Sequence, residues 1–223
     1  MNTVRPRIRK SASRTTANIR AKAEAPADLR EACVAAAHAV IAEQGIEQLS
    51  LRDVARRLGV SHQAPYKHYP SRDHLLAEVV RRSFVRFAEH LDRRERFDDP
   101  EKDLESLGFE YLRFALSNPL EYRLMFGTPW PKGAEHDALE RDARYAFDIL
   151  RDAIGRLHGA KAIKSGLADR DAMFVWAAMH GLAGVLQSNI MPSLALKPGV
   201  LENAVAHVMC RVSDAMGQPA KGA

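Results

Sequence analysis

Cysteine is nearly absent from this sequence, which holds only Cys33 and Cys210. The two residues are far apart, and each lies within an apolar pattern of helical spacing. Such a pattern favours two buried thiols over a disulfide or a metal site. We therefore expect no redox chemistry and no bound metal.

Long apolar runs are also absent. No stretch approaches the roughly 18 uninterrupted apolar residues that a membrane-spanning helix needs, so we expect no insertion into a membrane. The basic N-terminus is not followed by the apolar run of about 7 to 15 residues that marks a secretory signal. Together these observations predict a cytoplasmic protein.

Catalytic sequence patterns are missing as well. The chain has no P-loop, no HExxH, no GxSxG and no dinucleotide-binding glycine pattern. His136 beside Asp137, or His180 alone, does not form a catalytic constellation. We expect neither enzymatic activity nor a cofactor, and a helical enzyme is kept only as a rival hypothesis of another class.

Acidic residues are scarce at the N-terminus. Residues 1–26 hold one acid, Glu24, against seven basic residues, a net charge of +6 that exceeds the +5 of the whole chain. The basic residues are Arg5, Arg7, Arg9, Lys10, Arg14, Arg20 and Lys22. With almost no large apolar side chain, this arm is predicted to be disordered. It either follows DNA phosphates or enters a minor groove, or it is a solvated tail without a partner.

Alternating β patterns are missing beyond Pro100, and every long segment has helical periodicity. The fold class is therefore predicted to be all-α. The expected helices cover 27–44, 51–58, 61–69, a longer segment that begins after Ser71, then 101–117, 119–126, 135–158, 169–189 and 198–216.

Local signals mark a helix-turn-helix in the first part of the chain. Gly45 follows the first helix, and Ser50 with Asp53 three residues later resembles a capping box. Gly59 can take the positive φ that a tight turn between two short helices demands. In such a motif the second helix lies in the major groove of DNA with its polar residues outward. Residues 51–69 fit this description.

The segment LSLRDVARRLGVSHQAPYKHYPSRDHLL, preceded by AEQG, resembles the TetR/AcrR family of bacterial regulators over about the first 87 residues. The residues that match the family's order are Tyr66, Lys67, His68, Tyr69, Pro70 and Arg72. Two positions depart from it: Pro65 stands where an aliphatic residue is usual, and Tyr69 where Phe is commoner. Because Pro65 lies about one turn into the helix, we expect helix 61–69 to persist with at most one backbone bond lost.

The resemblance implies roles for the residues of this motif. Tyr66 and Lys67 would contact phosphates, and the residues that face or flank base edges would be His62, Gln63, Ala64 and His68. Gln63 can pair with an adenine edge and Ala64 can touch a thymine methyl.

Residues near the helix starts add phosphate contacts, since hydroxyl, guanidinium and N-terminal N–H groups bind anions. These residues are Ser50, Arg52 and Ser61. The alternatives are that Tyr66 and Tyr69 only pack against the first helix, and that Arg56 and Arg57 form a solvated face.

The rest of the chain resembles, more loosely, the C-terminal domain of a TetR subgroup named for a Trp-His-Gly signature. The matching segments are NPLEYRLMF at 118–126 and the run from Trp176 to Leu182, with His180 and Gly181 inside it. In that subgroup the domain dimerises through its last helices and usually encloses a pocket for a small effector.

Two helices carry the faces that a dimer would use. Helix 169–189 has small residues at Ala177, Ala178, Gly181, Ala183 and Gly184, and helix 198–216 has an apolar stripe of Val200, Leu201, Val205, Val208, Met209 and Val212. Two such helices from each subunit would form a four-helix interface. The alternative is that both faces pack within one chain.

An aromatic and Met-rich set of side chains supplies the candidates for an effector pocket, although most of them could instead be core. The set comprises Phe109, Tyr122, Met125, Phe126, Trp130, Trp176 and His180, with Phe114, Phe174 and Met179 in the same patterns. This composition favours an apolar or aromatic ligand. His180 either orients that ligand or is a satisfied core histidine.

The predicted organisation is a basic arm (1–26), a three-helix DNA-binding domain (27–87), a larger helical domain for dimerisation and effector binding (88–216) and a short tail (217–223), with a linking helix between the two domains. This order predicts a homodimeric repressor that binds a palindromic operator and is released by its effector. An activator is an alternative, because the sign of regulation depends on where the operator lies. The other alternative is an effector-independent architectural DNA-binding protein.

Overall fold

The computed structural model describes residues 28–127, 129–131, 136–161, 167–188 and 190–216. Within these ranges every regular element is helical and no strand forms, which confirms the all-α class. The α-helices are α1 (Leu29–Gln44), α2 (Leu51–Leu58), α3 (Arg72–Asp92), α4 (Pro100–Ser117), α5 (Pro119–Phe126), α6 (Asp137–Ala160), α7 (Ala168–Gln187) and α8 (Val200–Met216). Short 3-10 helices are η1 (Ile46–Gln48), η2 (Pro65–Lys67) and η4 (Met191–Leu194). The predicted basic arm and C-terminal tail lie outside the described residues.

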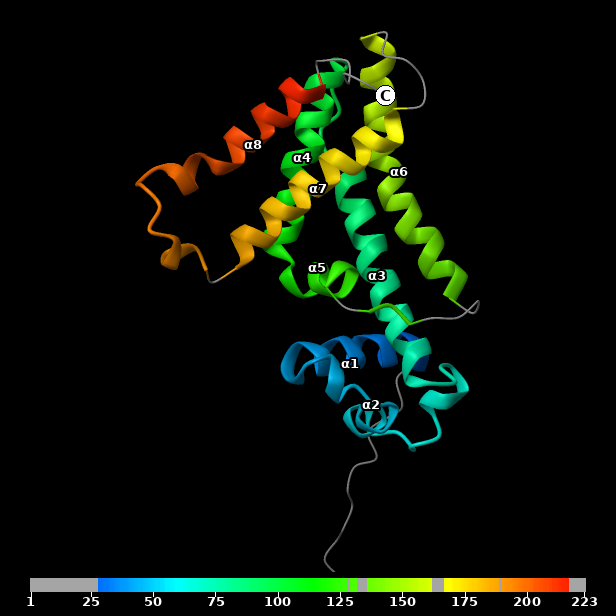
Figure 1. Cartoon of the computed structure of the whole chain (residues 1–223). Coiled ribbons are helices and arrows are strands. Elements are labelled where there is room, and N and C mark those ends of the chain that lie inside the picture. The colour runs from blue at the N-terminus through cyan, green and yellow to red at the C-terminus, as the bar shows by residue number, and fades with distance from the viewer. Residues whose placement is uncertain (1–27, 128, 132–135, 162–166, 189, 217–223) are drawn as a thin grey trace, which may run out of the picture.

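The first helices form a small head at one end of the molecule, with α1 and α2 below the larger set of helices in Figure 1. The Ser50 hydroxyl accepts the backbone N–H of Asp53 at 3.1 Å and donates to the Asp53 carboxylate at 2.6 Å, which starts α2 where the sequence predicted. Gly59 ends it in the left-handed region at φ 67° and ψ 23°. Both expected boundaries of α2 are confirmed.

The third helix differs from the expectation. Residues 62–64 form a turn and only Pro65–Lys67 are helical, as the 3-10 helix η2. Pro65 has no N–H, so it cannot bond the carbonyl of Ser61, which accepts the N–H of Ala64 at 3.0 Å instead. The prediction that an α-helix would persist over 61–69 was therefore wrong, since the proline changes the bonding pattern of the whole turn.

Helix α3 connects the head to the body. Ser71 caps it by accepting the N–H of His74, and Arg72 donates to the carbonyls of Ile46 and Leu49, which fixes its first turn to the head. The helix then continues past Phe87 to Asp92 and packs against α4, α5 and α6. Figure 1 shows it running from beside α2 up into the body, as the predicted linking helix should.

The body consists of α4 to α8, with α5 nearest the head and α7 crossing in front of α3 and α4 (Figure 1). On α8 the later part of the apolar stripe turns inward, because Met209 and Val212 are buried against the rest of the same chain, whereas Val200 at its start is 46% exposed. Cys33 is buried, but Cys210 is exposed, so the expectation of two buried thiols was wrong for the second. None of the described helices combines the length and apolar character needed to cross a membrane.

Candidate functional site

One exposed face of the head gathers four of the nine residues that the sequence assigned to DNA binding. Arg52 on α2 and His62, Gln63 and Tyr66 on the following turn line a common hollow. Of the other five, Ser61, Lys67 and His68 are exposed, while Ser50 and Ala64 are half-buried. The hollow therefore brings together a guanidinium, an imidazole, an amide and a phenol.

The inward side of the same turn explains how this face is held. Pro65 and Tyr69 are buried, and the Tyr69 hydroxyl donates to the carbonyl of Arg30 on α1 at 3.3 Å. Tyr69 thus packs against the first helix, which confirms the packing alternative for this residue. Tyr66 instead projects outward with 42% of its surface exposed. Within five residues, the 3-10 turn thus has one side that packs on the head and one side that faces solvent.

The charges around this face fall into two groups. Arg56 pairs with Asp53 at 2.6 Å and Arg57 pairs with Glu43 of α1, so both have partners within the head. Arg52 and Lys67 form no ion pair with any acid among the described residues. Their positive charge is available to an external anion.

A cavity of about 350 Å³ lies in the body. Its walls come from α3, α4, α6, α7 and α8, together with Phe126 at the end of α5 and Trp130 after it. Seven of the lining residues are aromatic: Phe84, Phe87, Tyr111, Phe126, Trp130, Phe147 and Trp176. Met173, Met179 and Met209 add flexible thioethers, and none of the described lining residues is charged. This is the composition of a pocket for an apolar ligand.

The predicted ligand-binding residues divide into three groups. Phe126, Trp130 and Trp176 line the cavity, as does Met179. Tyr122 and Met125 are buried and His180 is half-buried, and none of the three lines the cavity. Phe109 lies on the outer face of α4 with 41% of its surface exposed, and Phe174 is exposed on α7, so neither reaches the cavity. Phe114 is buried but is not part of the lining.

Sequence reasoning missed several lining residues, among them Phe84, Phe87, Tyr111, Phe147 and Met209. Phe84 and Phe87 lie three residues apart on α3, and both are buried. Spacing alone does not tell whether an inward side chain meets a neighbour or an empty volume, because that depends on how five helices pack. No local signal separates the two cases.

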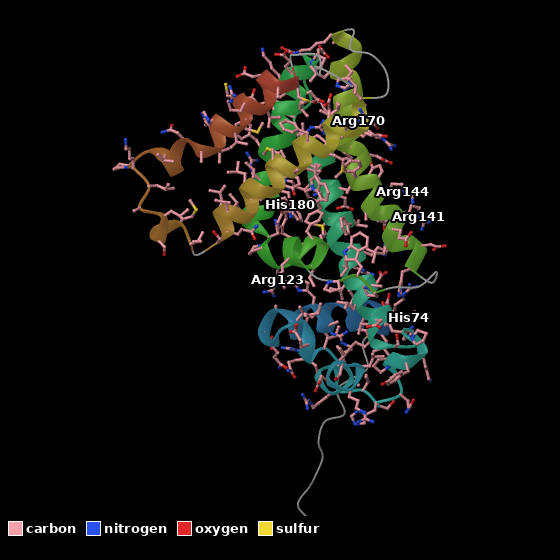
Figure 2. The ribbon with its side chains drawn as sticks, viewed as in Figure 1. His74, Arg123, Arg141, Arg144, Arg170 and His180 are labelled. Atoms are coloured by element: carbon pink, nitrogen blue, oxygen red, sulfur yellow. The ribbon has the colours of Figure 1, made fainter. Side chains whose placement is uncertain are left out.

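A buried polar cluster adjoins the cavity. The Tyr111 hydroxyl lies 2.8 Å from that of Tyr122, which lies 2.5 Å from Nδ1 of His180; Tyr111 is 3.2 Å from the same nitrogen. Burial lowers the pKa of His180, and burial raises the pKa of Tyr122 to about 12. The neutral imidazole therefore accepts a hydrogen bond from tyrosine at Nδ1 and carries its own proton on Nε2. Nδ1 of His180 is thus bonded within the fold, and Figure 2 shows the residue on α7 in the middle of the body.

Helix α5 links this cluster to the head. Its Glu121 carboxylate, buried with 8% of the residue exposed, lies 2.6 Å from Nη1 of Arg86 on α3 and 3.3 Å from Nε2 of His38 on α1. The next residue, Tyr122, belongs to the polar cluster. One helix of eight residues thus contacts the cavity wall with one side and the head with the other.

Two family models match separate parts of this chain. Residues 34–79 match the family model described as "Bacterial regulatory proteins, tetR family", and residues 104–208 match one described as "Tetracyclin repressor-like, C-terminal domain". The HTH-type transcriptional regulators Rv1816 of Mycobacterium tuberculosis and Mb1846 of Mycobacterium bovis are each 29% identical over 111 residues, 48% of this chain. The matched part spans 47%, about half, of each of these relatives.

Solved structures share the whole architecture. A Rhodococcus sp. RHA1 protein described as of unknown function is 25% identical with a TM-score of 0.69, covering 86% of this chain and 96% of that one. A putative tetR family transcription regulator from Shewanella sp. PV-4 is 16% identical with a TM-score of 0.62, covering 85% of this chain and 96% of that one. The second likeness, at so low an identity, concerns the fold alone.

Proposed function

Because this chain belongs to the TetR family of bacterial regulatory proteins, we propose that it is a homodimeric repressor that binds a palindromic operator and is released by a small apolar or aromatic effector. The observation that carries the proposal is the exposed face of the head, where cationic and amide groups surround the turn after α2. Its place of action is the cytoplasm, where bacterial DNA lies.

DNA reading follows from the groups on this face. Lys67 and Arg52 lack acidic partners among the described residues and bind phosphates, which sets affinity and register. Gln63 is exposed in the hollow beside Arg52 and reads an adenine edge in the major groove. His62 and His68 flank it, and the half-buried Ala64 touches a thymine methyl. The basic arm follows the phosphates next to this contact.

Dimerisation is supported by an unpartnered face of α7. Phe174, Ala177, Gly181 and Val185 are exposed at helical spacing, and a Cβ added at Gly181 would meet no atom within 4 Å. Small residues between two large ones allow a second helix to approach closely. The Val and Met stripe of α8 packs within its own chain, so α8 would meet the partner with its opposite, exposed side, at Ala206 and Cys210. A two-fold dimer places two heads on one side of a palindrome.

Release requires that the effector bind one arrangement of the heads better than the other. The cavity is the site for it, and α5 lies between the cavity and α1. Within the family we assign the body to the Trp-His-Gly subgroup, on account of Trp176, His180 and Gly181. In this reading Trp176 lines the effector cavity, His180 orders the polar cluster and Gly181 opens the dimer face.

The test is selection of binding sites from random duplex DNA by the purified full chain, followed by sizing of the complex on the selected sequence. A palindromic site bound by two or four chains supports the dimeric reader. Tight binding without any selected sequence would favour the architectural alternative and contradict the proposal. Placing the selected site between a promoter and a reporter then tests repression against activation.

A further inference from the structure

We propose that the cavity of the body accepts an uncharged aromatic molecule bearing one hydroxyl group, and that this hydroxyl docks at Tyr111. This inference rests on the proposed function in one respect, namely that an effector occupies this cavity. It names the chemical class of that effector, which the family assignment leaves open.

The lining excludes charged ligands. Among the residues that the structure describes, none in the lining is Asp, Glu, Lys, Arg or His. A carboxylate or an ammonium group entering the cavity would lose its hydration without gaining a counter-ion, and that loss is large in an apolar site. His180, the histidine bonded to Tyr111, stays neutral because burial lowers its pKa, so it does not offer a cation at this wall of the cavity.

The shape and composition of the lining favour a flat aromatic ligand. Phe84 meets Trp130 edge to face at 5.2 Å between centroids, and Phe147 meets Trp176 in the same manner at 6.2 Å. Rings arranged this way present both faces and edges, which complement another aromatic ring. The thioethers of Met179 and Met209 adapt to its outline. A volume of about 350 Å³ lies at the small end of ligand pockets and suits two fused rings.

The polar contact is confined to one corner. Tyr111 is the one described lining residue with a hydroxyl, and its oxygen is fixed by Tyr122 and His180. The Trp130 N–H is already used, since it donates to the carbonyl of Met125 at 2.8 Å. The indole of Trp176 lies against the Tyr111 hydroxyl and, as a hydrogen-bond donor, counteracts the burial that raises the pKa of Tyr111.

A ligand hydroxyl suits this corner because it can donate a hydrogen bond. It donates to the remaining lone pair of the Tyr111 oxygen. The Tyr111 oxygen is held in place before the ligand arrives, so little ordering is needed on binding. An ether or a bare hydrocarbon satisfies only part of this arrangement.

The experiment is calorimetric titration of the full chain with 2-naphthol, naphthalene and 2-naphthoate. We expect 2-naphthol to bind about fivefold more tightly than naphthalene, as one net hydrogen bond allows, and 2-naphthoate at least about 100-fold more weakly than 2-naphthol. Both tryptophans of the chain line the cavity, so a change in their emission reports the same binding independently.

The decisive variant is Tyr111→Phe, which keeps the ring and removes the hydroxyl. It should reduce the affinity for 2-naphthol to that for naphthalene and leave naphthalene binding unchanged. The matched control is Tyr145→Phe, because Tyr145 is 52% exposed on α6 and donates to Asp92 away from the cavity. The proposal is overturned if 2-naphthoate binds as tightly as 2-naphthol, if no probe binds, or if Tyr111→Phe retains the preference for 2-naphthol.

A second titration separates this inference from the proposed function. The Kd for the selected DNA is measured with and without saturating 2-naphthol. Binding of 2-naphthol with the expected preference but no change in the Kd for DNA supports the ligand class and contradicts release by this class of effector. A weaker Kd for DNA supports both.

Discussion

The carboxylate of Glu121 lies 3.3 Å from Nε2 of His38, and this pair joins the helix beside the cavity to the first helix of the head. Arg86 of α3 holds the same carboxylate at 2.6 Å. The neighbouring Tyr122 bonds to His180 on α7, so a ligand that displaced α5 would also change the position of Glu121 relative to α1. We regard this carboxylate as the positioning group between cavity and head.

Glu121→Gln should leave the calorimetric affinity for 2-naphthol unchanged while reducing its effect on DNA affinity by at least about threefold, since couplings between sites are typically of this size or larger. Its free energy of unfolding should fall by only about 1 kcal/mol, because both partners of Glu121 are substantially exposed.

The matched control is Glu110→Gln. Glu110 also pairs with a histidine and an arginine, His90 and Arg113, but α4 carries it away from the head. An equal loss of coupling in both variants would contradict the role of Glu121.

Lys67→Ala should weaken binding to every duplex and reduce the slope of log affinity against log salt by about one, because one phosphate contact is lost. Anisotropy titrations of two unrelated duplexes at several salt concentrations measure this. Lys197→Ala removes the same charge from an exposed loop beside α8. If both variants gave the same slope, Lys67 would not contact a DNA phosphate.

His180 should make the fold more sensitive to acid between pH 7 and 5. Burial lowers its pKa in the folded chain from the ordinary value of 6.5, so the unfolded chain takes up the proton first and stability falls as pH drops through this window. His180→Asn, which keeps an acceptor for Tyr122, should lose less free energy of unfolding between pH 7 and 5 than the unaltered chain. Urea unfolding at the two pH values measures the difference.

The control for that series is His207→Asn on the exposed side of α8. It should preserve the pH dependence of the unaltered chain. If His180→Asn also preserved it, the imidazole would not be held neutral by burial.

Asp103→Asn should lower the free energy of unfolding by about 3 kcal/mol, because it leaves a buried charge unpaired. The Arg94 guanidinium is fully buried and lies 3.0 Å from the Asp103 carboxylate, which also accepts from Arg156. Burial alone would raise the pKa of Asp103, but its bonds to the two arginines hold that pKa below the usual range. Denaturant unfolding of Asp103→Asn and of the exposed control Asp98→Asn measures this loss. Equal free energies of unfolding for the two variants would contradict the prediction.

Local signals in the sequence were sufficient for most of the fold. Ser50, Gly59 and Ser71 each act within a few residues of themselves, through a capping hydroxyl or a positive φ, so the helix ends they predict are the ends observed. Pro65 also acts locally, but its effect was underestimated: one missing N–H replaced an α-helical turn by a 3-10 turn.

The interior of the body could not be predicted in the same way. The stripe containing Met209 was expected to face a partner subunit, yet it faces α4, where Gly108 leaves room for the Met209 thioether. Tyr111 carries the polar corner of the cavity, but nothing near it in the sequence points to Tyr122 or His180. Contacts between residues so far apart depend on the packing of whole helices rather than on local pattern.

The central claim is that the turn after α2 reads DNA sequence, and the most direct measurement repeats the selection from random duplexes with Gln63→Ala beside the unaltered chain. Gln63 is exposed in the hollow of that face, and its amide matches an adenine edge. The account predicts that the variant still selects a palindrome but changes its preference at one position in each half-site. Selection of an unchanged sequence would show that Gln63 reads no base and would contradict the assignment of this face.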